Sequence, residues 1–527
     1  MVELNKVAEE ATRGSFFLIS GTAFATIILA ISSIMIARIL NPELYGQYSL
    51  VIVIPQIIFL FTDLGISQGT TKFVADAQFS GEKGQVAKII KHGLILRMMM
   101  GVLLFFATYY FADVLASFLL QRPELGFYVR ISSISILFQV IFTTATSAFV
   151  GMDKTEYNAV TTNIQAISKT VAQIGFALLG FAVAGAVLGH AFSFLFGGII
   201  GIALLFVLLR KNREALLCKY SFTENSRQLL KYGAPLYASV LLVGLIPFYQ
   251  NIILALFVTN SDIGNYRAAI NFAALLTVFS IPITTVMLPA FSRLGSATSD
   301  KMKLFFKLTN KYVTLIILPI AVLIILLSKE ILQIVYGSEF QSAPYFLALY
   351  CLLYLLVGFG NLTLLSFYNG IGETKITMRV SLITFTILVF LSPLLTQFYG
   401  VEGLIVAFLL ASVAGQTYSA FFATRKYKLE FDTRAILKIY LISGLSSIPV
   451  ILIKFFTFPS MLSVLFGGLL YLFIYITAIP AFKTLNLIET KKAVEVIQNV
   501  RFLSAAAKPV LKYQEKILVK IESLKSN

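Results

Sequence analysis

The chain contains few of the side chains that build disulfide frameworks, metal centres and indole-rich membrane belts. Its 527 residues include no tryptophan, two histidines and two cysteines, Cys218 and Cys351. Two cysteines exclude a disulfide framework, and two histidines are too few for a histidine-based metal site. We therefore expect no metal and no cofactor, and any interfacial aromatic belt has to come from the 24 tyrosines.

Charge is also scarce, because only 13% of the residues are charged whereas 58% are hydrophobic. The mean hydropathy of +0.86 is far above the value of a water-soluble domain. This composition excludes a soluble globular enzyme, a nucleic-acid-binding domain and a disordered chain. The 42 basic residues outnumber the 25 acidic ones. In a membrane protein, the positions of the basic residues indicate the orientation of the chain.

Motifs for ATP or metal chemistry are missing as well. Neither GISQGTTK (65–72) nor GIGETK (370–375) has the spacing of a phosphate-binding loop, and neither HExxH nor a CxxC pair occurs. No extramembrane segment is long enough to hold a separate active site. We therefore expect a protein that is not an enzyme and that does not bind ATP.

What the chain does contain is long apolar runs. A helix crosses the bilayer with about 20 apolar residues, and about fourteen stretches qualify. They are 15–38, 45–70, 93–120, 126–150, 159–182, 186–209, 233–258, 267–292, 312–328, 344–368, 378–399, 402–423, 436–456 and 461–482. The first is too long for a cleaved signal peptide, so we expect it to stay in the mature chain. The expected fold class is an all-α polytopic membrane protein.

The basic residues indicate the orientation. They concentrate in alternate loops, around 72–91, 210–231, 293–311 and 425–438, and in the C-terminal tail, whereas the opposite loops hold little beyond Arg122 and Lys329. The positive-inside rule then places both termini in the cytoplasm of a plasma-membrane protein. Residues 483–527 alternate apolar and basic side chains at helical spacing, which predicts an amphipathic helix on the inner leaflet. A partner-binding helix is the alternative.

An internal repeat organises the spans. The segment ARILNPELYGQYSL (37–50) matches ALFVTNSDIGNYRAA (255–269) at an offset of 218 residues, which pairs Gly46 with Gly264, and the same offset pairs Gly185 with Gly403. We predict two parallel six-helix repeats that form two lobes around a central cavity, although a duplication without a cavity is an alternative. The expected domains are an N-lobe at 1–209, a cytoplasmic linker at 210–232, a C-lobe at 233–423, two additional spans within 436–482 and a cytoplasmic tail at 483–527.

Polar residues recur on single faces of several spans. Because such residues are costly in lipid and normally face inward, we predict that they line a substrate-binding cavity. They are Asn158, Thr162, Gln165, Lys169 and Gln173 of span 5, Thr22 and Thr26 of span 1, Gln56 and Asp63 of span 2, Arg267 and Asn271 of span 8, and Arg38 at the end of span 1.

Lys169 is the most informative of these residues, because it lies near the middle of its span. A buried ammonium group needs a counter-charge or an anionic ligand. Two interpretations stay open: Lys169 binds a phosphate or pyrophosphate of the substrate, or it forms an ion pair with Asp63. Asp63 is also a candidate for coupling to a cation, and Arg38 and Arg267 either bind substrate or extend to lipid headgroups. We interpret His190 as a hydrogen-bonded helix-packing residue rather than a proton relay.

The segments GSFFLISGTAF, ARILNPELYGQYSL, FTDLGISQGTTKFVA and LPAFSRL resemble the multidrug/oligosaccharidyl-lipid/polysaccharide (MOP) flippase superfamily. Within it, spans 1–12 are similar to the polysaccharide transporters of the O-antigen-flippase type. The resemblance implies two six-helix lobes that move a lipid-linked sugar through a cationic cavity. Lipid II flippases typically carry an Arg-Asp pair in span 1, where this chain has Ser32 and Ser33. Lys169 and Arg267 are therefore the better candidates for meeting an anionic headgroup.

The expected function is alternating-access transfer of an oligosaccharide on a polyprenyl-phosphate-type carrier from the inner to the outer leaflet, for surface polysaccharide or glycan synthesis. The alternatives are a cation-coupled multidrug or metabolite exporter, a lipid II flippase, and a membrane enzyme such as a glycan polymerase or ligase. Expected partners are the lipid-linked oligosaccharide and membrane lipids, with Na⁺ or H⁺ as candidate coupling ions and glycan-assembly enzymes as candidate protein partners. No nucleic acid is expected.

Overall fold

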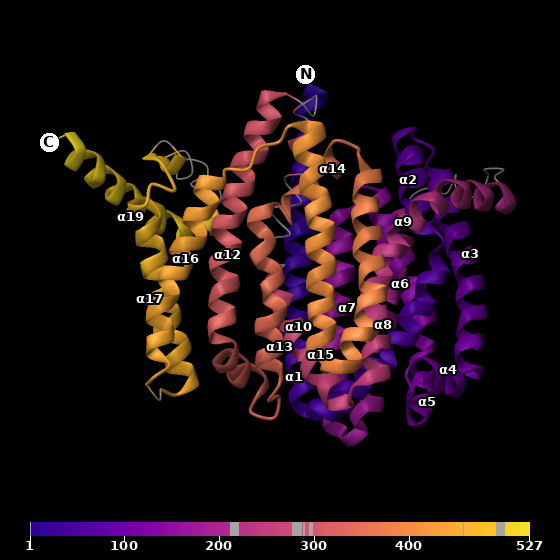
Figure 1. Ribbon diagram of the computed structural model, residues 1–527. Coiled ribbons are helices and arrows are strands. Elements are labelled where there is room, and N and C mark those ends of the chain that lie inside the picture. The colour runs from indigo at the N-terminus through magenta and orange to yellow at the C-terminus, as the bar shows by residue number, and fades with distance from the viewer. Residues whose placement is uncertain are drawn as a thin grey trace. The chain divides into compact units, whose positions relative to one another are not determined.

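The computed structural model describes residues 2–210, 221–276, 299–456, 458–487, 489–491 and 501–526, together with 287, 290–292 and 294. Throughout these ranges the regular secondary structure is helical, which confirms the predicted fold class (Figure 1). Residues 211–220 of the predicted linker and 492–500 of the predicted tail lie outside the described residues.

The helices are α1 (Val2–Asp63), α2 (Ile66–Phe79), α3 (Lys83–Tyr110), α4 (Ala112–Leu119), α5 (Gly126–Ser132), α6 (Ile134–Gly151), α7 (Thr155–Phe176), α8 (Ala182–Arg210), α9 (Phe222–Phe257), α10 (Asn260–Ala273), α12 (Asp300–Tyr336), α13 (Ala343–Cys351), α14 (Thr363–Gly370), α15 (Thr374–Tyr427), α16 (Thr433–Ile453), α17 (Ser460–Ala481) and α19 (Arg501–Ser526). A π-helical turn, Ala177–Phe181, joins α7 to α8, and 3₁₀ turns cover Pro123–Leu125 and Leu352–Phe359.

Within the described ranges, eight helical segments are long and apolar enough to cross a membrane. Three of them exceed the length of one crossing and are interrupted by a residue with positive φ: Asn41 (62°) in α1, Gly180 (88°) between α7 and α8, and Gly400 (58°) in α15. Left-handed backbone favours Gly and, less strongly, Asn, so the sequence itself places these breaks. They separate predicted spans 1 and 2, 5 and 6, and 11 and 12. The count of fourteen stays a prediction.

The predicted boundaries of span 3 are wrong. The span expected at 93–120 belongs to α3, which begins at Lys83 and ends at Tyr110, and α4 follows as a separate helix. The extra N-terminal turns of α3 carry Val86, Ile89 and Ile90, which are buried against other apolar side chains. Packing rather than hydropathy therefore sets the beginning of this helix.

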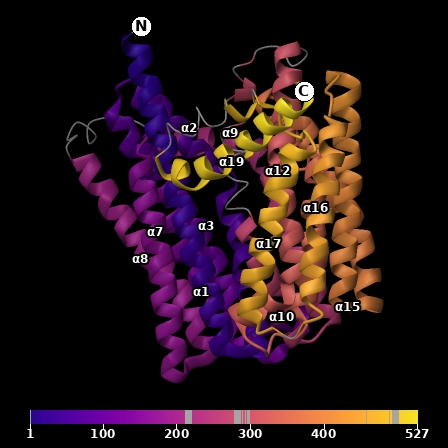
Figure 2. The same ribbon diagram turned by 90° about the vertical axis from the view of Figure 1, so that its left-hand side faces the viewer.

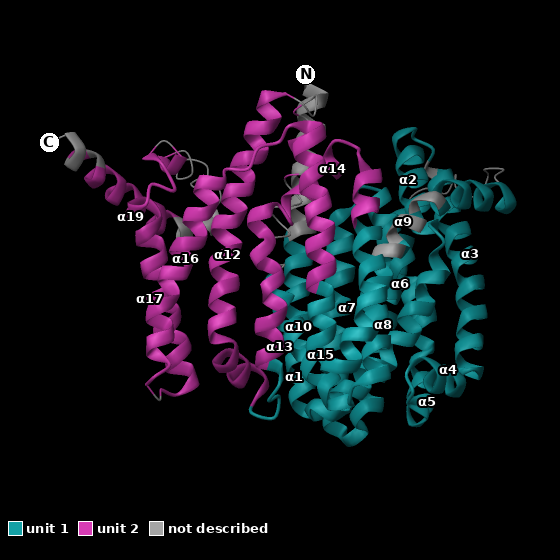
Figure 3. Cartoon of the chain, in the orientation of Figure 1, with its two compact units in different colours: residues 1–278, 338–343, 381–408 teal, residues 279–337, 344–380, 409–527 magenta. Residues whose placement is uncertain are grey.

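The chain divides into two compact units (Figure 3). Unit 1 comprises Met1–Val278, Ser338–Ala343 and Ser381–Phe408, and unit 2 comprises Phe279–Gly337, Pro344–Val380 and Leu409–Asn527. These units are defined by spatial contacts, whereas the predicted lobes, linker and tail are defined by the sequence repeat. The predicted domains therefore stay predictions.

In unit 1, α1 and α10 cross at the two repeat-related glycines. A Cβ atom on Gly46 would lie 1.8 Å from the carbonyl oxygen of Asn260, and one on Gly264 would lie 1.9 Å from the carbonyl oxygen of Pro42. Only glycine permits this approach of two backbones. The two positions that the sequence repeat pairs therefore make reciprocal contacts.

The other repeat-related pair, Gly185 and Gly403, is also equivalent in structure. Each follows a glycine with positive φ, Gly180 and Gly400, by a few residues. A Cβ atom on Gly185 would lie 2.8 Å from the carbonyl carbon of Phe176, and one on Gly403 would lie 2.0 Å from the carbonyl oxygen of Leu395. Each glycine lets its helix pack onto the backbone of the preceding segment, which supports the internal repeat.

Unit 2 is built on α12, α16 and α17, which lie side by side (Figures 1 and 2). Its core includes Phe306, Phe367 and Tyr427, whose rings pack edge to face. Helix α19 leaves this bundle obliquely at the end of α17 (Figure 2). Gln514 donates a hydrogen bond to the Ile476 carbonyl oxygen at 3.3 Å. The tail is thus helical over Arg501–Ser526, as predicted, while its place on the membrane surface stays a prediction.

Candidate functional site

A polar cavity of about 340 Å³ lies within unit 1. Helices α1, α7, α8 and α10 supply its polar lining, and apolar side chains of α1 and the residues after α10 complete it. The polar lining residues are Thr26, Ser33, Tyr45, Tyr48, Ser49, Gln56, Lys169, Gln173, His190, Arg267 and Asn271. The structure therefore brings together half of the residues predicted for the cavity, from segments far apart in the sequence.

One hydrogen-bond network joins α10 to α1 beside the cavity. The amide nitrogen of Asn271 donates to Ser33 Oγ and to the Tyr45 hydroxyl, both at 2.8 Å, and these two hydroxyls are 2.9 Å apart. Three hydroxyl or amide groups are thus fixed in one cluster. They present donors and acceptors of the kind that sugar hydroxyls use.

A second network joins α7 to α1. Gln173 Nε2 donates to the Tyr48 hydroxyl at 2.5 Å and to the Ala186 carbonyl oxygen at 3.0 Å, while Ser32 Oγ donates to Gln173 Oε1 at 3.2 Å. Gln173 and Ser32 are buried. This satisfied network holds Gln173 in one orientation at the cavity wall.

Two basic residues, Lys169 of α7 and Arg267 of α10, line the same cavity. Among the residues that the structure describes, neither forms an ion pair with a carboxylate. The Nε atom of Arg267 is buried and has no hydrogen-bond partner within the described part of the chain. Both side chains are partly exposed at the cavity. The cavity is therefore electropositive and offers donors to an anion.

His190 of α8 also lines the cavity and is only 5% exposed. Its ring packs edge to face on Phe194, with the ring centroids 5.1 Å apart, as expected of a helix-packing residue. Among the described residues, however, neither ring nitrogen has a hydrogen-bond partner, so the prediction of a hydrogen-bonded histidine is wrong. Packing on the Phe194 ring, rather than a hydrogen bond, therefore holds the imidazole in place.

Asp63 does not line the cavity. Its carboxylate lies 3.4 Å from Arg97 Nε and accepts hydrogen bonds from the Ser67 amide (3.0 Å) and hydroxyl (2.6 Å). Arg97 is 2% exposed and also donates to Thr143 and Thr144. In this structure the ion-pair partner of Asp63 is therefore Arg97 of α3 and not Lys169.

The remaining predicted residues lie outside the cavity lining. Gln165 is buried and donates to Ser193 of α8 at 2.9 Å, since Gly197 leaves room for its side chain. Thr162 donates to Asn158 at 3.3 Å along α7. The carbonyl oxygen of Thr22 accepts from Thr26 at 2.8 Å, and both Thr22 and Arg38 are exposed.

Tyr45 and Tyr48 line the cavity, although neither was among the predicted cavity residues. Both tyrosines lie in the repeated segment 37–50, where Tyr45 directly precedes Gly46 of the helix crossing. The repeat is the sequence feature that could have identified them, because a segment that forms a close helix crossing also places its neighbouring side chains in the cavity lining.

Comparisons with known proteins agree with this architecture. "Probable low-salt glycan biosynthesis flippase Agl15" of Haloferax volcanii is 24% identical over 220 residues, and the alignment spans 40% of this chain and 44% of that relative. Lipid II flippase MurJ in an inward closed conformation superposes with a TM-score of 0.69 and 16% identity, over 88% of this chain and 99% of MurJ. An inward-facing MATE-family multidrug resistance transporter of the MOP superfamily gives a TM-score of 0.63 and 16% identity, over 76% of this chain and 94% of that one.

The two solved structures show that the fold is that of MOP-superfamily transporters. Residues 11–295 match the protein family described as "Polysaccharide biosynthesis protein", and this match covers more than half of the sequence. The chain therefore belongs to the polysaccharide biosynthesis protein family.

Proposed function

We propose that the protein is a flippase that moves a lipid-linked oligosaccharide, carried on a polyprenyl phosphate or pyrophosphate, from the inner to the outer leaflet. The family membership and the glycan-flippase relative support this proposal. One observation carries it: Lys169 and Arg267 line a polar cavity of a transporter fold without a carboxylate partner among the described residues.

The carrier phosphate accounts for these two cations. A phosphate supplies negative oxygens that accept hydrogen bonds from the Lys169 ammonium and the Arg267 guanidinium. Arginine offers a planar fork of donors that matches two oxygens of one phosphate, whereas lysine acts as a point charge. Lys169 and Arg267 are partly exposed, and a bound headgroup would compensate the charge of both, which favours an anionic cargo over a neutral or cationic one.

The hydroxyl and amide groups around the cations account for the sugar. Ser33, Tyr45 and Asn271 are already ordered by hydrogen bonds to one another, so little side-chain entropy is lost when sugar hydroxyls bind. Gln56 and Thr26 add further polar groups to the lining. The polyprenyl chain would stay in the bilayer while the headgroup crosses, and alternating access would expose it on the other side.

Reconstitution of the full chain into liposomes tests this proposal. The probe is a fluorescent lipid-linked oligosaccharide, and the readout is its transfer between leaflets. We expect transfer by the unmodified protein and its loss in Lys169→Gln and Arg267→Gln. Lys154→Gln is the matched control, because Lys154 precedes the same helix, α7, and lies outside the cavity lining.

Transfer that is unchanged in both cavity variants would overturn the assignment of the phosphate to these residues. The same liposomes also test the exporter alternative. Efflux of a cationic dye without transfer of the lipid-linked oligosaccharide would replace the flippase by a drug exporter. We do not propose Asp63 as a coupling carboxylate, because Arg97 already compensates its charge.

A further inference from the structure

Unit 2 contains a polar pocket of about 170 Å³, which we call the basic pocket. It lies between the N-terminal end of α16, α12 and the segment that follows α17. Four basic side chains, Lys311, Arg434, Lys438 and Lys483, line it beside two acidic ones, Asp432 and Glu489. The basic pocket and the cavity of unit 1 share no lining residue, so the role of this pocket does not depend on the flippase assignment.

Both acidic groups of the basic pocket are already engaged. Glu489 accepts from Lys311 Nζ at 2.9 and 3.1 Å, and this ion pair is largely buried. Asp432 caps α16 by accepting a hydrogen bond from the Ala435 amide at 3.1 Å. Lys438 makes one hydrogen bond, to the Phe482 carbonyl oxygen at 2.9 Å, which does not neutralise its charge. The cap hydrogen bond leaves Asp432 charged, but four basic side chains against two carboxylates still give the pocket a net positive charge.

A buried hydroxyl group offers a free hydrogen-bond donor in the basic pocket. Thr484 is 3% exposed and lines the pocket, and its Oγ1 has no hydrogen-bond partner among the residues that the structure describes. An unsatisfied buried hydroxyl is destabilising, so such groups normally find a partner. A ligand with acceptor oxygens would satisfy Thr484 and compensate Arg434 together.

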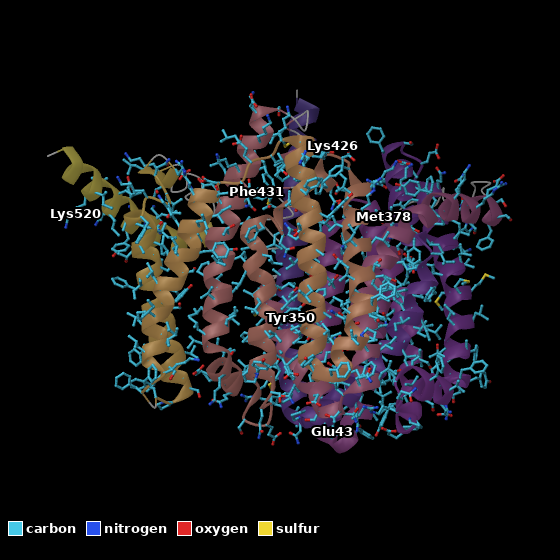
Figure 4. The ribbon with its side chains drawn as sticks, in the orientation of Figure 1. Glu43, Tyr350, Met378, Lys426, Phe431 and Lys520 are labelled. Carbon is cyan, nitrogen blue, oxygen red and sulfur yellow. The ribbon has the colours of Figure 1, made fainter. Side chains whose placement is uncertain are left out.

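The basic pocket lies where an apolar surface begins. Along α16, the exposed side chains Leu437, Leu441, Leu445, Ile448 and Leu452 recur at helical spacing and form one stripe. The stripe starts beside Arg434 and Lys438, and Phe482, which is also exposed, directly precedes Lys483. Figure 4 shows Phe431, the residue before Asp432, at the same end of unit 2 as Lys426 and Lys520, with Tyr350 nearer the middle. Basic side chains at the end of an apolar stripe are typical of the membrane interface.

We propose that the basic pocket binds the phosphate group of an anionic phospholipid whose acyl chains lie along the α16 stripe. The Arg434 guanidinium donates to the phosphate oxygens as a fork, Lys438 adds a point charge, and Thr484 donates its hydroxyl hydrogen. Basic pockets between membrane helices bind anionic headgroups in this way. The ligand class is therefore a phosphodiester with attached acyl chains.

Titration of the full-length, delipidated protein in detergent tests this proposal, with bound lipid counted by native mass spectrometry. The probes are phosphatidylglycerol, phosphatidylcholine and glycerol 3-phosphate. We expect phosphatidylglycerol to bind most tightly, Arg434→Gln to weaken it about ten-fold or more, and Thr484→Val to weaken it about five-fold. Lys428→Gln is the matched control, because Lys428 is exposed at the end of α15 and does not line the pocket.

Three results would overturn the proposal. If Lys428→Gln weakened phosphatidylglycerol binding as much as Arg434→Gln, the binding would depend on general surface charge and not on the pocket. Equally tight phosphatidylcholine would remove the selectivity for an anionic lipid, and equally tight glycerol 3-phosphate would assign the pocket to a soluble phosphate ester. Arg434 is exposed, so its variant keeps the fold, and Thr484→Val tests the same site without changing its charge.

Discussion

The ion pair between Asp63 and Arg97 offers the sharpest test of how unit 1 is held together. The two side chains are 15% and 2% exposed, so both charges lie largely out of water. Asp63→Asn keeps an oxygen for the Ser67 amide but leaves the Arg97 guanidinium without a counter-charge. Removing one partner of a buried pair costs about 3–5 kcal/mol. We expect a clear fall in the thermal unfolding midpoint, measured in detergent at a fixed scan rate.

Two comparisons make this result interpretable. The double variant Asp63→Asn with Arg97→Met removes both charges, so it should be more stable than Asp63→Asn alone. The control is Asp113→Asn, because the Asp113–Arg130 pair is exposed and such pairs contribute about 0–1 kcal/mol. If Asp63→Asn unfolds at the temperature of the unmodified protein, or if the two substitutions add, the reasoning about buried charge is refuted.

Three further predictions concern packing and pH. Gly264→Ala should destabilise unit 1 by about 1–3 kcal/mol, because the added Cβ would lie 1.9 Å from a backbone oxygen of α1. Gly468→Ala is the control and should be tolerated, because no described atom lies within 4 Å of its added Cβ. Thermal unfolding measures both effects. Phe367→Ala should cost unit 2 about 3–5 kcal/mol, because the ring is fully buried; equal stability would refute its place in the core. Hydrogen bonds from Lys426 and Tyr427 lower the pKa of Glu373, so the ionised carboxylate stabilises the folded protein. This contribution to stability is complete above the unfolded pKa of about 4.3 and is lost as the pH falls through the folded pKa. Glu373→Gln should weaken that acid dependence, measured as unfolding midpoint against pH.

Much of the fold follows from local properties of the sequence. Hydropathy identifies the membrane helices, and Asn41, Gly180 and Gly400 mark breaks because these residue types tolerate positive φ. The repeat pairs Gly46 with Gly264, and the structure places these two residues at one crossing. Hydropathy does not place the beginning of α3, because burial against other helices extends it.

The polar face of a single helix predicts the lining of the cavity only in part. A helical wheel places Lys169, Gln173 and Gln165 in one arc of α7, yet only the first two line the cavity, since Gln165 bonds to Ser193 of α8. The wheel contains no information about which neighbour covers each part of the arc. For the same reason it did not reveal that Arg97, from α3, compensates Asp63.

Binding of the headgroup tests the central claim most directly, namely that Lys169 and Arg267 bind the anionic part of the cargo. The measurement compares the affinity of purified protein for a soluble oligosaccharide diphosphate and for the same oligosaccharide without phosphate. We expect the diphosphate to bind about 30-fold more tightly or better, and Lys169→Gln to abolish most of this difference while Lys154→Gln preserves it. Equal affinities for the two sugars in the unmodified protein would contradict the account.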